Sequence, residues 1–98
     1  MNLFAIAGHL GQSPESGDKN GKPWTRLRVA VNRRKDEADW FDVVAFGKLA
    51  ENTSTLHTGD GVAIEGRLEI RHSEGYGAQV KLKAHTVKFF RRTPAEDS

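Results

Sequence analysis

Hydrophobic and polar residues alternate with a period of two along five stretches of the chain, which predicts β-strands with one buried face. The predicted strands span residues 2–11, 24–32, 40–46, 62–71 and 78–90. The residues expected to point inward are Phe4, Ile6, Leu10, Leu27, Val29, Val31, Val62, Ile64, Leu68, Ile70, Val80, Leu82 and Ala84. Gly66 shares this inward parity and predicts a bulge where the sheet curls. Turn-forming and charged residues predict loops at 13–23, 33–39 and 72–77.

The period of the pattern changes after Phe46. Leu49, Thr53 and Leu56 follow a spacing of i, i+4 and i+7, which predicts a short helix of about two to three turns, and Gly59 is placed to end it. Three strands, a helix and two strands in this order predict an all-β protein with the OB-fold, a five-stranded Greek-key barrel with a short helix between strands 3 and 4. An SH3-like barrel usually lacks that helix, and a ferredoxin-like fold needs two helices.

Aromatic residues lie on both faces of the predicted strand 40–46. One face carries Trp40, Asp42, Val44 and Phe46, and the other carries Phe41, Val43 and Ala45. Only one of these faces can enter the core of a small barrel, so the face with Trp40 and Phe46 is available for another purpose. Two structural alternatives stay open, in which Phe46 packs beneath the helix and Trp40 covers the open end of the barrel.

The composition is that of a single ordinary globular domain. The chain has 98 residues, of which 37% are hydrophobic and 29% are charged, so one modest core is expected. The absence of cysteine excludes disulfides, thiolate metal sites and cysteine nucleophiles. No stretch has the length of a membrane span or the pattern of a signal peptide, and we expect a cytoplasmic protein without a membrane partner.

Charge is distributed unevenly along the chain, although the formal net charge is only +2. Residues 22–35 contain six basic residues and no acidic one, whereas residues 36–60 contain six acidic residues and a single Lys, Lys48. Such segregation is typical of a surface that faces a polyanion. A strand edge protected by charge gives the same pattern, so charge alone does not choose between them.

A candidate binding surface follows from the predicted fold. OB-folds bind oligonucleotides or oligosaccharides around strands two and three, and single-stranded nucleic acid needs a cationic groove together with aromatic rings on which bases stack. The outward positions of these strands and of the adjoining turns supply both kinds of side chain. They are Arg26, Arg28, Arg33, Arg34, Lys35, Trp40 and Phe46, with Arg67 and Arg71 added by the fourth strand and His72 and Tyr76 by the turn after it. Trp24, beside Pro23, is expected to be structural or to lie in a subunit contact, and Lys81 and Lys83 to form a solvated strand face.

Four segments together resemble the single-stranded DNA-binding protein family of bacteria and phages. They read "GHLGQSPE", "NGKPWTRLRVAVNRR", "DWFDVVAFGKLAEN" and "GDGVAIEGRLEIR", and they run through nearly the whole chain. The string "WFDVVAFGKLAE" followed by "IEGRL" is highly specific, because no general constraint of the fold demands it.

The resemblance implies particular roles for residues of this chain. Trp40 and Phe46 match family positions that stack on bases, Lys48 matches a contact to the DNA backbone, and Arg71 matches an arginine at the end of strand four. The resemblance also implies a homotetramer that coats single-stranded DNA during replication, recombination and repair, with no metal or nucleotide cofactor.

The chain departs from the family pattern at three places. Many members carry a further Trp where this chain has Arg33–Arg34, and another in the hairpin where it has only His72, Ser73 and Tyr76. Fewer stacking rings predict weaker or more salt-sensitive binding. Members that recruit other enzymes have a flexible linker and an acidic tip, whereas this sequence stops at "PAEDS". We expect an OB domain over residues 1–92 and a flexible tail over 93–98, and either a longer natural protein or a short relative fits.

Two other classes of function are weighed against this one. An enzyme is disfavoured, because the four histidines fall at no metal-ligand spacing and Asp39 and Asp42 point to opposite faces of their strand. No nucleophile motif or phosphate loop is present, so no small-molecule substrate is expected. A protein-binding or RNA-binding OB module, or a purely structural interaction protein, stays open.

Overall fold

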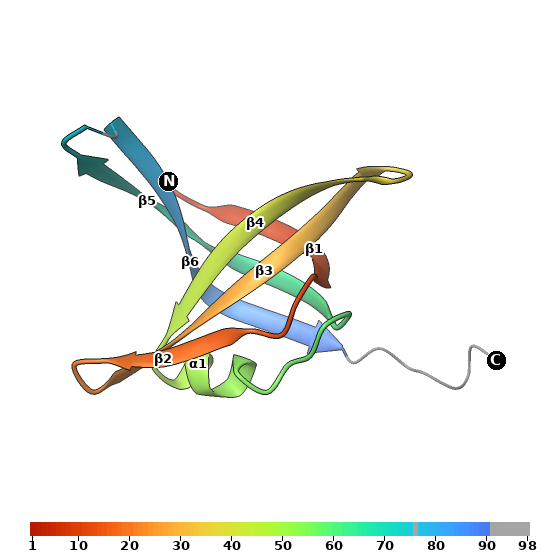
Figure 1. The fold of residues 1–98 in the computed structure, drawn as a ribbon, viewed down its shortest axis with the longest axis horizontal. Coiled ribbons are helices and arrows are strands. Elements are labelled where there is room, and N and C mark those ends of the chain that lie inside the picture. Colours follow the sequence, from red (N-terminus) through yellow and green to blue (C-terminus); the bar gives the residue numbers. More distant parts are fainter. Residues whose placement is uncertain (76, 91–98) are drawn as a thin grey trace.

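The computed structural model describes residues 1–75 and 77–90, which form six strands and one helix (Figure 1). The elements in chain order are β1 (Phe4–Leu10), β2 (Glu15–Lys19), β3 (Lys22–Arg34), β4 (Glu37–Phe46), α1 (Lys48–Thr53), β5 (Gly61–Ser73) and β6 (Gly77–Phe90). The predicted tail over 93–98 and Tyr76 lie outside the described residues, so the domain boundary stays a prediction.

The strands form one sheet in the order β1-β5-β6-β4-β3-β2, and a further pairing closes it into a barrel. The closing contact is antiparallel and joins β1 to β3 at His9↔Ala30 and Leu10↔Val29. The ring therefore contains β1, β3, β4, β6 and β5, with β2 attached outside it to β3. Helix α1 lies between the third and fourth ring strands along the chain and below the barrel in Figure 1. This arrangement confirms the predicted OB-fold.

The core is built from the inward-facing residues of the ring strands, together with Ala50 of α1 and Leu56 after it. Its buried members are Leu10, Leu27, Val29, Val43, Ala45, Ala50, Leu56, Val62, Ile64 and Ala84. On β4 the buried residues are Val43 and Ala45, and Phe41 packs against them. The face with Trp40 and Phe46 is therefore the outer one, as the alternation predicted. Each fully buried aliphatic side chain contributes about 1.5–3 kcal/mol through removal from water.

Helix α1 is shorter than the sequence predicted. It ends at Thr53, whose hydroxyl donates to the carbonyl of Leu49 at 2.9 Å, and Leu56 is buried beyond the helix. Such back-bonding slightly destabilises a helix. The buried hydroxyl of Thr25 on β3 donates to the carbonyl of Ala50 at 2.7 Å and fixes the helix to the barrel. Gly59 lies in the turn before β5 rather than at the helix end, so its predicted role was wrong.

Strand β2 occupies much of the segment predicted to be a loop, residues 13–23. It pairs with the start of β3 from Glu15↔Arg26 to Lys19↔Lys22. Asn20 and Gly21 both have positive φ, 54° and 83°, and join the two strands as a tight two-residue hairpin turn. The second predicted loop, 33–39, is also mostly strand, because only residues 35–36 form the turn between β3 and β4.

The β5–β6 hairpin extends beyond the part of the barrel that other strands cover (Figure 1). Ile70 and Val80 are directly paired, yet they are 54% and 60% exposed. The prediction that both side chains point into the core is wrong. Strand β4 pairs with β6 only at Val43↔Leu82 and Val44↔Lys83, so the barrel does not reach this part of the hairpin. Beyond this pairing, no described strand covers the hairpin.

The predicted bulge at Gly66 is confirmed. The register of β5 and β6 shifts between Glu65 and Gly66, where the pairing passes from Thr86 to Ala84. A side chain at Gly66 would collide with the backbone oxygen of Lys83 and with the ring of Phe4. Only glycine therefore permits this close approach of the two strands.

Candidate nucleic-acid interface

The outer face of β3 and β4 consists of four rows of directly paired residues. Directly paired residues of an antiparallel ladder project from the same face. The rows are Trp24↔Phe46, Arg26↔Val44, Arg28↔Asp42 and Ala30↔Trp40. Strand β6 continues this face beside β4, because the parallel pairing sets Lys83 next to Val44. Aromatic and basic side chains from three strands thus share one surface.

The ring of Phe46 is surrounded by three ammonium groups. The Nζ atoms of Lys22, Lys81 and Lys83 lie 5.4, 5.2 and 5.4 Å from its centroid. Cations at such distances are attracted by the ring, by about 0.5–1 kcal/mol at exposed sites. Phe46 is half-buried and remains on the outer face, so it does not lie in the core cluster.

Lys81 and Lys83 are functional candidates that the sequence analysis missed. Their alternation on β6 predicted only a solvated strand face, but both are half-buried and lie against Phe46. They reach it through the parallel pairing of β4 with β6, which joins segments far apart in the chain. Nothing local in the sequence signals that pairing.

Trp40 lies at the other end of the face and is 49% exposed. The guanidinium of Arg28 lies 5.1 Å from the centroid of its ring. The indole also rests on Gly11, where a side chain would overlap the ring. Trp40 therefore does not belong to the hydrophobic core.

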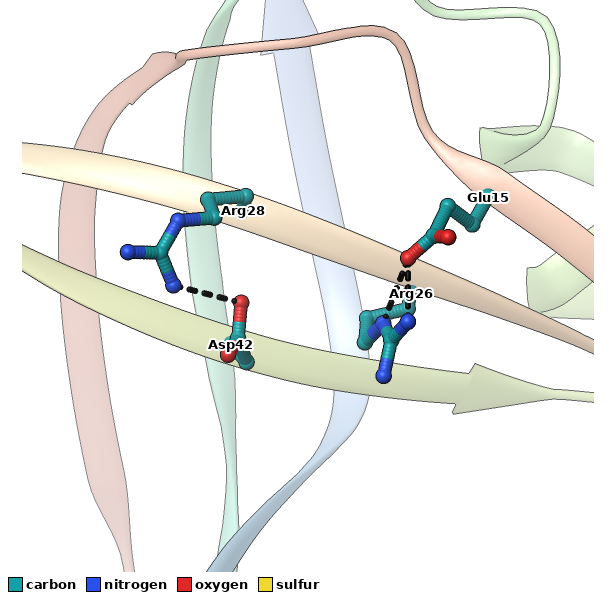
Figure 2. Close-up of polar contacts among 4 residues, drawn as sticks. All are labelled: Glu15, Arg26, Arg28 and Asp42. Atoms are coloured by element: carbon teal, nitrogen blue, oxygen red, sulfur yellow. Dashed lines mark hydrogen bonds and ion pairs between the residues drawn. The ribbon is translucent and has the colours of Figure 1, made fainter.

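The arginines of β3 are paired with carboxylates of the same face (Figure 2). Arg26 Nε donates to Glu15 Oε1 at 2.8 Å and Nη2 donates to the same oxygen. The hydrogen bond and the charge of Glu15 raise the pKa of Arg26. Arg28 Nη1 donates to Asp42 Oδ1 at 3.0 Å. The segregation of bases and acids along the sequence is thus partly cancelled in space, because β2 and β4 bring acids to the bases of β3.

Arg33 and Arg34 lie at the far end of the β3–β4 hairpin. Arg33 forms ion pairs with Glu37 at 3.2 Å and with Asp39 at 3.0 Å. Arg34 lies 3.8 Å from Glu37. Both side chains are more than half exposed, so these pairs are easily exchanged for other partners.

The remaining predicted site residues lie at different places. Arg71 lines a depression of about 360 Å³ together with Arg26, Asp42, Val44, Gln79, Val80 and Lys81, so it belongs to the outer face. His72 is exposed one position further along β5, on the opposite side of the strand. Lys48 is exposed at the first residue of α1, two residues after Phe46.

A second depression adjoins Trp40, where β4 and β6 separate. Its volume is about 460 Å³, and Trp40, Phe41, Asp42, Leu68, Val80 and Leu82 line it. A third, of about 210 Å³, lies at the Phe46 end among Lys19, Trp24, Arg26, Val44, Phe46 and Lys81. Trp24, predicted to be structural or intersubunit, thus lies beside Phe46. Its ring also covers Gly17 of β2.

Two further findings concern other kinds of site. Within residues 1–75 and 77–90, no three His, Asp or Glu side chains gather in a way that could hold a metal ion. No helix among the same residues is long and apolar enough to cross a membrane.

The sequence of this chain matches that of a known protein family. The model of the single-strand binding protein family matches residues 1–93. A single-stranded DNA-binding protein of Thermotoga maritima is 35% identical over 98% of this chain and 78% of its own length. One from Fusobacterium nucleatum is 31% identical over 82% of this chain and 58% of its own length.

Solved structures show the same likeness. The crystal structure of the wild-type single-stranded DNA binding protein from Thermus aquaticus superposes with a TM-score of 0.78 at 30% sequence identity. The match covers 97% of this chain and 43% of the Thermus chain. This chain therefore spans less than half the length of that protein.

Proposed function

Because this chain belongs to the single-strand binding protein family, we propose that it binds single-stranded DNA, independently of sequence, on the outer face of β3, β4 and β6. The observation that carries the proposal is the joint placement of Trp40 and Phe46. Both rings lie outside the core, on one face, with cationic groups 5.1 to 5.4 Å from their centroids.

Binding on this face combines two physical effects. Unpaired bases stack on Trp40 and Phe46, and each stack contributes about 1–3 kcal/mol whatever the base. Phosphates are held by the cationic side chains of the same face. We assign this role to Lys22, Arg26, Arg28, Arg71, Lys81 and Lys83, and extend the path to Lys48, Arg33, Arg34 and His72. Stacking and charge read no base edge, which makes the binding tolerant of sequence.

The biological role follows from the family. We propose that the protein covers and protects transiently exposed strands during DNA replication, recombination and repair, in the cytoplasm at the nucleoid. It carries out no catalytic step and uses no cofactor in this role. We further propose a homo-oligomer, a tetramer by family resemblance, and sedimentation in solution tests that state directly.

Competition between DNA and RNA tests the proposed function. The protein is mixed with oligothymidylate, its tryptophan fluorescence is followed, and oligouridylate is then added as competitor. We expect DNA to quench the fluorescence and RNA to compete poorly. Equal competition by RNA would favour an RNA-binding module, and no quenching by either would favour a structural interaction protein.

A further inference from the structure

The two ends of the proposed DNA-binding face differ in how their cations are paired. At the Phe46 end, Lys22, Lys81 and Lys83 surround the ring, and within residues 1–75 and 77–90 none of them lies at ion-pair distance from a carboxylate. The carboxylate next to Lys81 is that of Glu69, which is bridged to Arg67 instead. We call Trp24, Phe46 and these lysines the lysine subsite. At the Trp40 end, the cation beside the ring is Arg28, which is bridged to Asp42. We call Trp40, Arg28 and Asp42 the arginine subsite.

The carboxylates of Glu15 and Asp42 bind guanidinium groups, which also bind phosphate oxygens. The fork of an arginine binds carboxylate and phosphate with the same geometry. Asp42 lies directly opposite Arg28 on β4, and Glu15 lies directly opposite Arg26 on β2 (Figure 2). All four side chains are 40% to 53% exposed, so water and salt weaken the pairs enough for exchange.

Asp42 also holds Arg28 beside the ring of Trp40. Its hydrogen bond to Nη1 keeps the guanidinium 5.1 Å from the centroid of the indole. A phosphate that binds Nη1 of Arg28 competes with Asp42 for that donor. Arg26 and Glu15 form a second such pair in the row between the two subsites.

We propose that single-stranded DNA occupies the two subsites in a fixed order, the lysine subsite first and the arginine subsite second. Glu15 and Asp42 compete with the strand for Arg26 and Arg28, which weakens its binding at the Trp40 end. This inference rests on the proposed function, because it concerns how DNA fills that same face. It assigns to Glu15 and Asp42 a role in setting the length of strand that binds tightly.

Strand geometry separates the subsites. Trp40 and Phe46 are six residues apart on β4, which corresponds to about 20 Å at about 3.3 Å per residue. A short oligonucleotide therefore fits one subsite, and a longer one is needed to cover both.

The two tryptophans provide one reporter for each subsite. Trp24 is paired with Phe46 and lines the depression at the Phe46 end. Trp40→Phe leaves Trp24 as the reporter of the lysine subsite, and Trp24→Phe leaves Trp40 as the reporter of the arginine subsite. Each variant is titrated with oligothymidylates of about four and about twelve nucleotides, within the range of sites known for one OB-fold.

We expect the short oligonucleotide to quench Trp24 at several-fold lower concentration than it quenches Trp40. Asp42→Asn should then tighten the binding reported by Trp40 about two- to fivefold, which corresponds to the loss of one exposed ion pair. Binding of the short oligonucleotide reported by Trp24 should change less, because at an ionic strength of about 0.15 M charges are screened beyond about 8 Å. Glu15→Gln should tighten binding of the long oligonucleotide by a similar factor.

Two controls separate exchange of partners from a general effect of charge. Glu65→Gln removes an exposed carboxylate that lies beside Ala5 and Lys88, in a depression away from this face, and should alter neither reporter. In an Arg28→Gln background, Asp42→Asn should lose most of its effect, because no pair is left to break. Circular dichroism of each variant confirms that it remains folded.

Three outcomes would overturn the proposal. Trp40 responding before Trp24 would reverse the order, and equal tightening of both reporters by Asp42→Asn would show a general charge effect. If Asp42→Asn had the same effect in the Arg28→Gln background, Asp42 would not be competing with DNA for Arg28. Failure of the proposed function looks different, because then neither oligonucleotide would bind any variant in fluorescence or in a gel-shift assay.

Discussion

The guanidinium of Arg28 lies 5.1 Å from the centroid of the Trp40 ring, although the two residues belong to different strands. The contact exists because Arg28 pairs with Asp42 and Ala30 pairs with Trp40, which sets the two side chains in neighbouring rows of one face. A cation beside an exposed ring is what a strand of unpaired nucleotides needs, since it offers charge for phosphate and a flat surface for a base. The same relationship repeats at Phe46 with three lysines.

Trp40→Ala should weaken DNA binding and leave the fold intact. Loss of one stacked base costs about 1–3 kcal/mol of binding free energy, and Trp40 is 49% exposed, so little of the core depends on it. Binding isotherms with oligothymidylate and urea unfolding curves measure the two quantities. Trp40→Phe, which keeps a ring, serves as the matched control. A large loss of stability with unchanged DNA affinity would make Trp40 structural.

Replacing both Lys81 and Lys83 with Ala should reduce the salt dependence of DNA binding. For single strands the slope of log affinity against log salt becomes shallower by about 0.7 for each phosphate that the protein no longer neutralises. Binding of oligothymidylate over a range of sodium chloride concentrations gives the slope. A slope identical to that of the unaltered protein would remove these lysines from the path of the phosphates.

Arg33→Ala combined with Arg34→Ala tests the tip of the β3–β4 hairpin in the same way. We expect a flatter salt dependence, because both guanidiniums are exposed and their pairs with Glu37 and Asp39 can be exchanged for phosphate. The salt slope is again the measurement. If it does not change, the hairpin tip lies outside the DNA footprint.

Leu27→Ala should destabilise the barrel by about 2–5 kcal/mol, because Leu27 is fully buried and its removal leaves a cavity. Urea unfolding followed by circular dichroism measures the change. Ile70→Ala is the matched control, since Ile70 is 54% exposed and should alter stability by less than about 0.5 kcal/mol. Similar losses of unfolding free energy in the two variants would show that the side chain of Ile70 is buried in solution.

Glu69 should titrate below its ordinary range. Hydrogen bonding to Arg67 lowers the pKa of its carboxyl from 4.5, with smaller contributions from the charges of Lys83, Arg67 and Lys81. A carboxyl with a lowered pKa in the folded state stabilises the protein above its unfolded pKa and loses that contribution as pH falls through the folded value. Carbon-detected NMR titration gives the midpoint. In Arg67→Gln it should move back toward 4.5, and an unmoved midpoint would assign the shift elsewhere.

The alternation of strand 40–46 was sufficient to predict the central element of the candidate site. Val43 and Ala45 are buried, so period-two geometry alone sets Trp40 and Phe46 on the outer face. The OB topology followed from element order in the same way. Both features could be predicted from one sequence, because they depend only on neighbouring residues and on the order of helices and strands along the chain.

Other features depend on contacts between distant segments and could not be predicted locally. Lys81 and Lys83 reach Phe46 only through the parallel β4–β6 pairing. Glu15 reaches Arg26 only because β2 pairs with β3, and β2 has no apolar alternation because it lies outside the ring. The dipeptide Asn20–Gly21 was the one signal of that hairpin. Ile70 and Val80 were misassigned because alternation continues past the point where the barrel ends.

Titration with a thymidine homopolymer at two salt concentrations, followed by tryptophan fluorescence, tests most directly whether stacking rings and neighbouring cations together bind a single strand. We predict quenching at both concentrations and clearly weaker binding at the higher one, with a slope of about −0.7 per neutralised phosphate. Absence of quenching, or an affinity that does not change with salt, would contradict it.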